Sequence, residues 1–215
     1  MIRTLIVIYC CAVATVAALG LLVTAGLTDG PDQAISDWFR TAEGRPIGSA
    51  TVIEYGRDVT AMGSAVAISL ATAAGAAWLA LQRRWHNLMV LSVVLVAAAV
   101  ISVSLKDSIE RARPQASHWL ALSDYSFPSG HSLFSMAIYP TLALALATSK
   151  RSRRYLVGCG LACAVLVGVS RVYLGAHFPS DVLAGWSIGL GIAILAGLIL
   201  DEPPRPAGES YFDGI

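Results

Sequence analysis

Three short polar clusters interrupt an otherwise apolar chain of 215 residues, and each contains residue types that can do chemistry on an anion. The clusters are Lys106-x(6)-Arg113-Pro114, Pro128-Ser129-Gly130-His131 and Ser170-Arg171-x(5)-His177-x(3)-Asp181. A single charged residue at the end of a membrane helix often does no more than reach toward the polar surface. Three clusters with three cations, two histidines and a carboxylate indicate a shared site instead, and this set suits a phosphate ester.

The cations and the turn in the second cluster predict where a phosphate group would bind. Lys106, Arg113 and Arg171 can neutralise its non-bridging oxygens. The turn at Ser129 and Gly130 leads into an apolar helix, and the first N–H groups of a helix attract anions. The Ser129 hydroxyl and the Gly130 N–H add directional donors. We therefore expect a phosphate-binding site made of these five residues.

The two histidines can divide the steps of a phosphoryl transfer. His177 and Asp181 are four residues apart, so one helical turn places the carboxylate beside the imidazole. The carboxylate fixes the tautomer and leaves the other ring nitrogen of His177 free to attack phosphorus. His131 can protonate the leaving alcohol oxygen and then deprotonate the water that breaks the phosphohistidine. We predict His177, His131 and Asp181 as the catalytic residues.

The sequence predicts neither a metal ion nor another cofactor for this reaction. Magnesium sites need several carboxylate oxygens together, whereas Asp107, Glu110 and Asp124 are scattered along one polar loop. The formal net charge of the chain is only +1, so bulk charge does not indicate a nucleic-acid partner. Anion affinity must therefore come from a few placed cations.

Composition and apolar runs indicate how these clusters are positioned. Apolar residues make up 56% of the chain and charged residues 13%, about half the share that is usual in soluble domains. Apolar segments occupy residues 5–27, 59–81, 88–105, 131–148, 155–170 and 180–200. Segments of about 20 apolar residues span a bilayer. The fold class we predict is all-α: a polytopic membrane protein with six transmembrane helices in one bundle.

The N-terminal end of the chain is expected to be helical and the C-terminal end flexible. The first segment follows Arg3 like a signal peptide, but its apolar run is longer than a typical signal core and lacks a clear cleavage site, so we favour a retained helix. We expect one membrane phosphatase domain over residues 1–215, with the helical bundle over 1–200. Residues 201–215 are predicted to form a flexible cytoplasmic tail.

The longest polar stretch, residues 29–57, is predicted to contain short amphipathic helices. Ile35, Trp38 and Phe39 recur at helical spacing beside charged residues, which is typical of a helix lying on the membrane surface. An ordinary structured loop is an equal alternative for this part. A second short helix is expected from about Ser49, after a run with Gly and Pro that breaks the first.

The basic residues predict the orientation. With six spans, Arg3, the Arg83-Arg84 pair and the basic run 150–154 share one side, which the positive-inside rule assigns to the cytoplasm. Both termini would then be cytoplasmic in an integral cytoplasmic (inner) membrane protein, with the three clusters facing the periplasm or the cell exterior. Gly185 and Gly189 in the last segment favour close helix contacts inside one bundle, so a monomer or weak homodimer is expected.

At the three clusters the sequence closely resembles the type 2 phosphatidic acid phosphatase superfamily of integral membrane lipid phosphatases. Its signature, Lys-x(6)-Arg-Pro, Pro-Ser-Gly-His and Ser-Arg-x(5)-His-x(3)-Asp, is complete here and in order. The resemblance covers residues 106–181 directly and implies the roles assigned above from the chemistry. Arg111 and His118 lie outside the signature; we expect a loop-surface role for both, with contact to a lipid head group as the alternative.

The resemblance implies metal-independent hydrolysis of a lipid phosphate through a phosphohistidine at the outer face of the membrane. The implied substrates are phosphatidylglycerophosphate, phosphatidic acid or undecaprenyl diphosphate, with membrane lipids as the surrounding partners. A lipid A phosphatase, or a phosphotransferase that passes the phosphate to a second lipid, remains open with the same site. An anion transporter would leave the pairing of His177 with Asp181 unexplained, and a soluble haloperoxidase with a similar anion site conflicts with the apolar segments.

Overall fold

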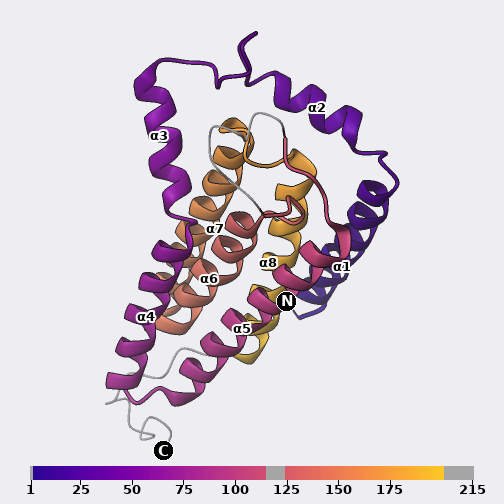
Figure 1. Cartoon of the computed structure of the whole chain (residues 1–215). Coiled ribbons are helices and arrows are strands. Elements are labelled where there is room, and N and C mark those ends of the chain that lie inside the picture. The colour runs from indigo at the N-terminus through magenta and orange to yellow at the C-terminus, as the bar shows by residue number, and fades with distance from the viewer. Residues whose placement is uncertain (1, 115–123, 201–215) are drawn as a thin grey trace, which may run out of the picture.

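A computed structural model describes residues 2–114 and 124–200, and these residues form helices and no strand. The helices are α1 (Ile2–Thr24), α2 (Asp29–Asp37), α3 (Ala50–Ala61), α4 (Ala65–Leu81), α5 (Trp85–Ile109), α6 (Gly130–Leu146), α7 (Lys150–Tyr173) and α8 (Pro179–Ile199). Figure 1 shows them as one bundle, with α2 lying across the end where α5 finishes. The all-α prediction is confirmed, and the predicted tail 201–215 lies outside the described residues.

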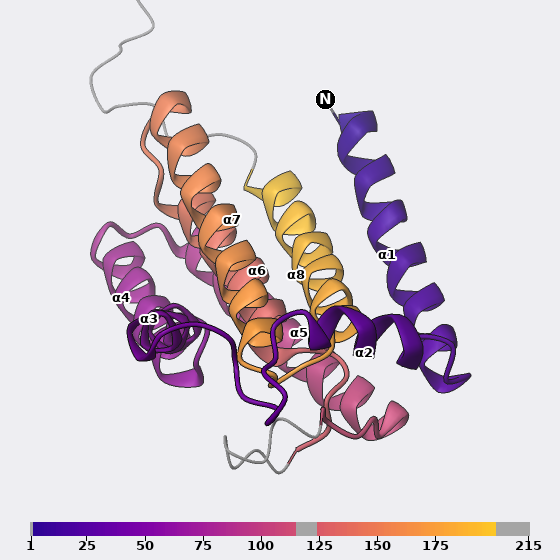
Figure 2. The same ribbon diagram turned by 90° about the horizontal axis from the view of Figure 1, so that it is seen from above.

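Helix α6 is the centre of the bundle. It packs against α4, α5, α7 and α8, whereas α1 packs mainly against α8 at the edge (Figure 2). Most residues of α6 are buried, including polar ones. The hydroxyls of Ser135 and Thr141 each donate to a carbonyl of the preceding turn, those of His131 and Ala137, at 2.7 Å. The hydrogen bonds of these two hydroxyls are therefore satisfied within the helix, and neither hydroxyl needs a polar partner outside α6.

Two glycines of α8 let it approach α6 closely. A Cβ atom at Gly185 would lie 2.7 Å from the carbonyl oxygen of Ser129, and one at Gly189 would lie 2.5 Å from that of Leu133. Any larger side chain would collide with backbone atoms of α6. The expectation that these glycines serve contacts inside one bundle is confirmed.

Fewer helices meet the criteria for spanning than the six predicted. Helices α1, α5, α7 and α8 are long and apolar enough to cross a membrane, and the pair α3–α4 would make a fifth if the two count as one bent span. Helix α6, with 17 residues, is shorter than that criterion requires. The structure therefore supports four or five candidate spans, and six are not confirmed.

The prediction of one continuous helix over residues 59–81 is wrong, because the chain breaks between α3 and α4 and bends by 44°. At the break, a Cβ on Gly63 would lie 2.4 Å from Cγ1 of Val167 and 3.2 Å from Cβ of His131. Ser64 then caps α4 by accepting the N–H of Ala67 at 3.2 Å. The break brings the end of α3 against the helices that hold the second and third clusters.

The polar stretch before α4 is helical, as one of the two alternatives predicted. Helix α2 ends at Asp37, before Trp38, and it turns Asp32 and Ser36 toward the protein. Trp38 is 74% exposed and Ile35 37%, whereas Phe39 is half-buried and packs edge-on against Tyr173. Helix α3 starts after Ser49, close to where a second helix was expected, and the Ser49 side chain caps it by accepting the N–H of Val52.

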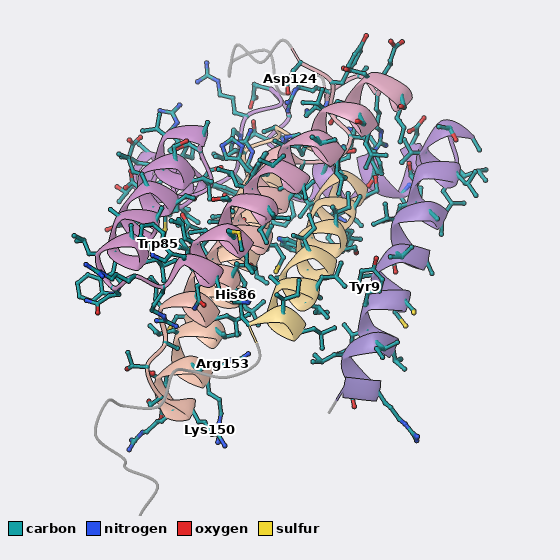
Figure 3. The ribbon with its side chains drawn as sticks, turned by 90° about the horizontal axis from the view of Figure 1, so that it is seen from below. Tyr9, Trp85, His86, Asp124, Lys150 and Arg153 are labelled. Atoms are coloured by element: carbon teal, nitrogen blue, oxygen red, sulfur yellow. The ribbon has the colours of Figure 1, made fainter. Side chains whose placement is uncertain are left out.

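The basic run lies at the opposite end of the molecule from the loop that precedes α6. Lys150 and Arg153 lie at one end of the bundle and Asp124 at the other (Figure 3). The run forms the start of α7, where Ser149 and Ser152 make a capping box. The sequence predicted that residues 149–154 connect two apolar segments, but they are helical from Lys150 onward. Nearby, the side chain of Asn87 donates to the carbonyl of Ala145 at 3.0 Å, which ties the start of α5 to the end of α6.

Candidate active site

The structure brings all eight predicted site residues to one end of the bundle. Helix α5 ends there after Lys106, α7 ends there after Arg171, and α6 and α8 begin there with His131 and Asp181. The backbone N–H of Ser129 donates to the carbonyl oxygen of Asp181 at 3.0 Å, so the second and third clusters are joined directly. Chain segments distant in sequence therefore meet because antiparallel helices share their ends.

His177 is buried, with 2% of its surface exposed, and its two ring nitrogens face different groups. Nδ1 lies 3.5 Å from Oδ2 of Asp181, and Nε2 lies 3.0 Å from Nη1 of Arg113. A guanidinium only donates hydrogen bonds, so Nε2 must accept with its lone pair and the proton belongs on Nδ1. This neutral tautomer is the one that a nucleophile at Nε2 requires.

Burial sets the protonation of His177. Loss of hydration lowers its pKa to about 4, although the hydrogen bond and the charge of Asp181 act to raise it. The charges of Arg113 and Arg171 act in the same direction as burial, and the pKa of about 4 includes their effect. The imidazole is therefore neutral at pH 7 and ready to attack an electrophile.

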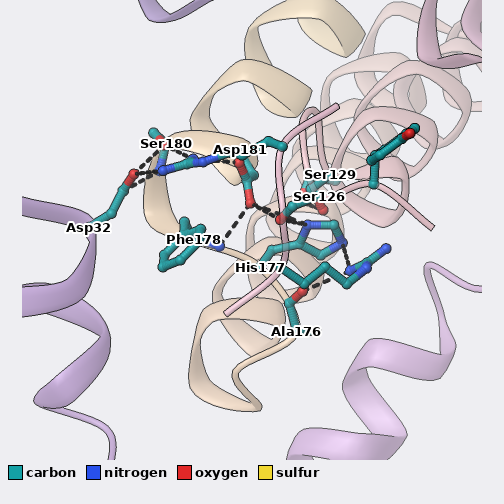
Figure 4. Close-up of polar contacts among 12 residues, drawn as sticks. Asp32, Ser126, Ser129, Ala176, His177, Phe178, Ser180 and Asp181 are labelled. Atoms are coloured by element: carbon teal, nitrogen blue, oxygen red, sulfur yellow. Dashed lines mark hydrogen bonds and ion pairs between the residues drawn. The ribbon is translucent and has the colours of Figure 1, made fainter. Parts of the chain in front are cut away.

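Asp181 is fully buried at the start of α8, and both of its oxygens have partners (Figure 4). Oδ2 accepts the backbone N–H of Phe178 at 2.9 Å and the hydroxyl of Ser126. Because Pro179 starts α8, Asp181 falls in its first turn, where a carboxylate is stabilised by the helix dipole.

Ser126 was missed by the sequence analysis. Its Oγ lies 3.4 Å from Nδ1 of His177 as well as donating to Asp181, so it lies beside both members of the predicted pair. The available signal was its place, two residues before the Pro128 that opens the second cluster.

Arg111 is buried, and the expectation that it lies on the loop surface is wrong. Its Nη1 donates to Oδ1 of Asp181 at 2.7 Å, and its Nη2 donates to Oδ2 of Asp32 at 2.8 Å. The guanidinium also lies over the Phe178 ring, 4.4 Å from the centroid. Burial alone would lower the pKa of Arg111, but the two carboxylates outweigh burial and raise it. The same expectation for His118 concerns a residue outside the described part of the chain.

Lys106 and Arg113 share one carboxylate, that of Asp124. Nζ of Lys106 lies 2.7 Å from Oδ2 of Asp124, and Nη2 of Arg113 lies 2.5 Å from Oδ1. Burial would raise the pKa of Asp124, but the hydrogen bonds and charges of the two cations outweigh it and lower the pKa to about 2. The ionised carboxylate of Asp124 is thus paired with Lys106 and Arg113, two of the residues predicted to bind phosphate. The sequence analysis did not predict this contact.

Arg171 presents an unused donor. It is buried, its Nη1 donates to Oγ1 of Thr60 at 3.0 Å, and its Nε has no hydrogen-bond partner. Buried donors in folded proteins almost always have partners, so an orphan N–H beside other cations fits a position where an anion binds. Thr60 comes from the end of α3, which reaches Arg171 because of the break at Gly63.

The second cluster completes the site from α6. Ser129 is buried, and its Oγ accepts the hydroxyl of Ser132 at 3.0 Å. Gly130 and His131 form the first turn of α6, whose leading N–H groups lie at this end of the bundle. Over residues 2–114 and 124–200, no group of three or more His, Cys, Asp or Glu side chains is placed to hold a metal ion.

Comparisons with known proteins identify relatives of this chain. The sequence pattern of the PAP2 superfamily matches residues 87–202. The chain is 40% identical over 121 residues to phosphatidylglycerophosphatase B of Bacillus subtilis, a match that covers 54% of this chain and 59% of that protein. It is 34% identical over 115 residues to a lipid A 1-phosphatase of Rhizobium johnstonii, with 49% and 44% covered. The matches therefore span less than two thirds of either relative.

A solved structure extends the likeness to most of the chain. The crystal structure of a transmembrane PAP2 type phosphatidylglycerolphosphate phosphatase from Bacillus subtilis superposes with a TM-score of 0.74 at 28% identity. The superposition covers 85% of this chain and 92% of that one.

Proposed function

The chain belongs to the PAP2 superfamily, and we propose that it hydrolyses a lipid phosphate monoester or diphosphate without a metal ion. The observation that carries the proposal is the environment of His177. Its Nδ1 faces Asp181 and its Nε2 faces Arg113, so a neutral, oriented imidazole stands beside a cation that can bind phosphate. This arrangement supports nucleophilic catalysis at Nε2.

In the first step, the lone pair on Nε2 of His177 forms a bond to phosphorus while the bond from phosphorus to the lipid oxygen breaks. His131 acts as the imidazolium, which the negative charge of the bound phosphate favours, and gives its proton to that leaving oxygen. Asp181 stabilises the charge that the phosphorylated imidazole carries. In the second step, His131 takes a proton from a water molecule, which attacks the phosphohistidine and releases inorganic phosphate.

The cations lower the barrier by neutralising charge on the transferring group. We assign phosphate binding to Lys106, Arg113, Ser129, Gly130 and Arg171. Lys106 and Arg113 must exchange the carboxylate of Asp124 for phosphate oxygens, and the unpartnered Nε of Arg171 is available to one more. Preorganised donors of this kind need no reorganisation when the reaction occurs.

We place this site at the outer face of a cytoplasmic (inner) membrane, in a bundle with six spans. The fifth and sixth spans are the bent pair α3–α4 and α6, whose 17 residues rise about 25 Å. The basic start of α7, which includes Lys150, lies at the end away from the site and supports a cytoplasmic assignment for that end. Both termini would then be cytoplasmic, and we propose a monomer or weak homodimer.

The substrate we favour is phosphatidylglycerophosphate, since two similar proteins carry that activity in their names. Phosphatidic acid and undecaprenyl diphosphate present the same phosphate chemistry. An apolar cavity of about 340 Å³ between α1, α5 and α8 supports a lipid substrate, because its lining includes Leu105, the neighbour of Lys106. The relative from Rhizobium favours lipid A as a second candidate substrate for the same site.

The experiment is phosphate release by detergent-purified protein, with EDTA present, from a panel of these lipids. His177→Ala is expected to lose about 10³-fold or more of the activity. His86→Gln is the matched control, because His86 lies at the other end of the bundle near Ile199 and should behave as the parent does. Phosphate that appears on a second lipid would indicate a phosphotransferase. Equal activity of His177→Ala and the parent would refute the proposal.

A further inference from the structure

A second ion pair lies behind the carboxylate that faces His177. The guanidinium of Arg111 lies between Asp181 and Asp32, with 2.7 Å from Nη1 to one carboxylate and 2.8 Å from Nη2 to the other. Figure 4 shows Asp32 on one side of this network and Asp181 with His177 on the other. The network therefore joins helix α2 to the nucleophile through three side chains.

Asp32 is an unusual residue for a short helix at the surface. It is 3% exposed, although α2 lies across the end of the bundle and most of its residues are exposed. Its Oδ1 accepts the backbone N–H of Ser180 at 2.9 Å, and its Oδ2 accepts the Ser180 hydroxyl at 2.5 Å. A buried carboxylate is costly unless it is paired and hydrogen-bonded, so the whole of this side chain is committed to Arg111 and to the start of α8.

The hydroxyl of Ser180 is a neutral bridge between the two charged groups: its Oγ accepts from Nη1 of Arg111 at 2.7 Å and donates to Asp32. The two remaining acceptors of Arg111 are more distant. Asp29 accepts from Nη2 at 3.2 Å, but its side chain is 69% exposed to solvent, which screens the pair. Thr28 accepts from the same nitrogen at 3.1 Å. The two buried carboxylates therefore dominate the position of the guanidinium.

We propose that Arg111 and Asp32 are positioning residues that hold Asp181 in the orientation which keeps the proton of His177 on Nδ1. The inference deepens the proposed function and rests on it. Neither residue belongs to the three-part signature, and neither touches the site where phosphate would bind.

The two oxygens of Asp181 explain why positioning is needed. Oδ2 faces His177 and Ser126, while Oδ1 is held by Arg111. The terminal torsion of a carboxylate is soft, so without Arg111 the group can rotate and Oδ1 is left buried without its charged partner. The charge of Asp181 would then also act on His177 without a balancing cation on its far side, and the imidazole would become more basic.

The variants at Arg111 keep the other charged groups around His177. They are Arg113 in the loop after α5, Arg171 at the end of α7, His131 at the start of α6 and Asp181 itself. Because these groups are common to parent and variant, a change in the titration of His177 reports the loss of Arg111.

The test compares Arg111→Gln, Arg111→Lys and Asp32→Asn with two matched controls on α2. Asp29→Asn removes the exposed carboxylate on the same guanidinium, and Asp37→Asn removes an exposed one that pairs with Gln33. Two readouts are taken on full-length protein in detergent: kcat and KM for phosphate release, and the titration of His177 by nitrogen NMR, assigned with His177→Gln.

For Arg111→Gln we expect kcat to fall about 10-fold or more with KM within about twofold, and the midpoint of His177 to rise by about one pH unit. Asp32→Asn should lower kcat in the same way, and Arg111→Lys should retain the parent midpoint because it keeps the buried charge. Asp29→Asn and Asp37→Asn should match the parent. A role in stability alone would change the yield or the melting temperature but not the midpoint of His177.

Three results separate the outcomes. If Arg111→Gln and Asp32→Asn match Asp37→Asn in both readouts while the parent is active, the inference is overturned and the proposed function stands. If the parent releases no phosphate from any lipid, the proposed function fails, and the His177 midpoint in Arg111→Gln still decides the inference. If Arg111→Gln does not fold, kcat of Asp32→Asn decides the inference, and a parent-like kcat in that variant refutes it.

Discussion

Nε2 of His177 lies 3.0 Å from Nη1 of Arg113, on the side of the ring away from Asp181. The cation that would bind phosphate is therefore also the donor that holds the attacking nitrogen in its deprotonated form. The same Nη1 donates to the carbonyl of Ala176 at 2.7 Å, which fixes the guanidinium beside the ring. A phosphate oxygen that binds Arg113 would arrive next to Nε2, so substrate binding and attack share one contact.

The activity should persist to unusually low pH. Burial and the nearby cations lower the pKa of His177 from its ordinary value of 6.5 to about 4. The neutral nucleophile is present above that value. The decline of kcat/KM at acid pH should therefore have its midpoint near pH 4 and not near pH 6.5. A pH profile between 3.5 and 8 measures this.

Two controls show whether the decline at acid pH comes from the enzyme, from the substrate or from unfolding. The second ionisation of a phosphate monoester lies near pH 6, and a phosphorus NMR titration of the substrate separates it from the enzyme. Below pH 6.5 the unfolded chain takes up a proton on His177 that the folded chain refuses until about pH 4, so stability also declines over that window. Recovery of activity on return to pH 7 excludes unfolding, and an enzyme midpoint at 6–7 would contradict the prediction.

Removing the guanidinium of Arg171 should cost the enzyme charge stabilisation. Arg171→Gln is expected to lower kcat/KM about 10²-fold, as for other lost donors to developing charge. The loss of kcat/KM should be smaller for Arg171→Lys, because lysine keeps the positive charge and loses only the paired N–H donors of the guanidinium. Arg154→Gln, on the exposed far end of the same helix α7, is the control and should retain the parent value. A parent-like Arg171→Gln would remove this residue from the site.

Asp124 should compete with the substrate. Its carboxylate binds both Lys106 and Arg113 in the absence of phosphate, so a phosphate group must displace it. Asp124→Asn is expected to strengthen inhibition by inorganic phosphate about threefold to tenfold, since a like charge is removed from the site. Asp107→Asn, an exposed neighbour of Lys106, should leave the inhibition constant unchanged. Weaker inhibition in Asp124→Asn would mean that Asp124 organises the cations and does not compete.

Two glycine-to-alanine substitutions should have opposite effects on stability. Gly185→Ala pushes a Cβ to 2.7 Å from the Ser129 carbonyl and should destabilise the fold by about 1–3 kcal/mol. Gly158→Ala, on the exposed face of α7 with nothing within 4 Å of its Cβ, should stabilise it by about 0.5–1 kcal/mol. Thermal unfolding in detergent compares the two. Equal melting temperatures would show that α8 is free to shift away from α6.

The signature residues show how far local sequence information reaches. His177 and Asp181 could be paired from their spacing alone, because one helical turn has a known length. The close helix approach at Gly185 and Gly189 and the start of a helix near Ser49 were also predictable from local sequence. The break at Gly63 was not, because the apolar run continues through it and only the side chains of Val167 and His131 show why the helix stops there.

Types and spacings of residues thus determined by themselves the helical class, and they predicted the chemistry of the site and the eight residues expected in it. Only the tertiary structure decided which other groups hold them. Asp32 comes from α2, Thr60 from α3, and Arg111, Asp124 and Ser126 from the connection between α5 and α6. These residues have no shared motif, so their contacts depend on how the helix ends meet. The physical reason is that a buried charge takes whatever partner lies within about 3 Å in space, and spacing along the chain carries that information only within one helical turn.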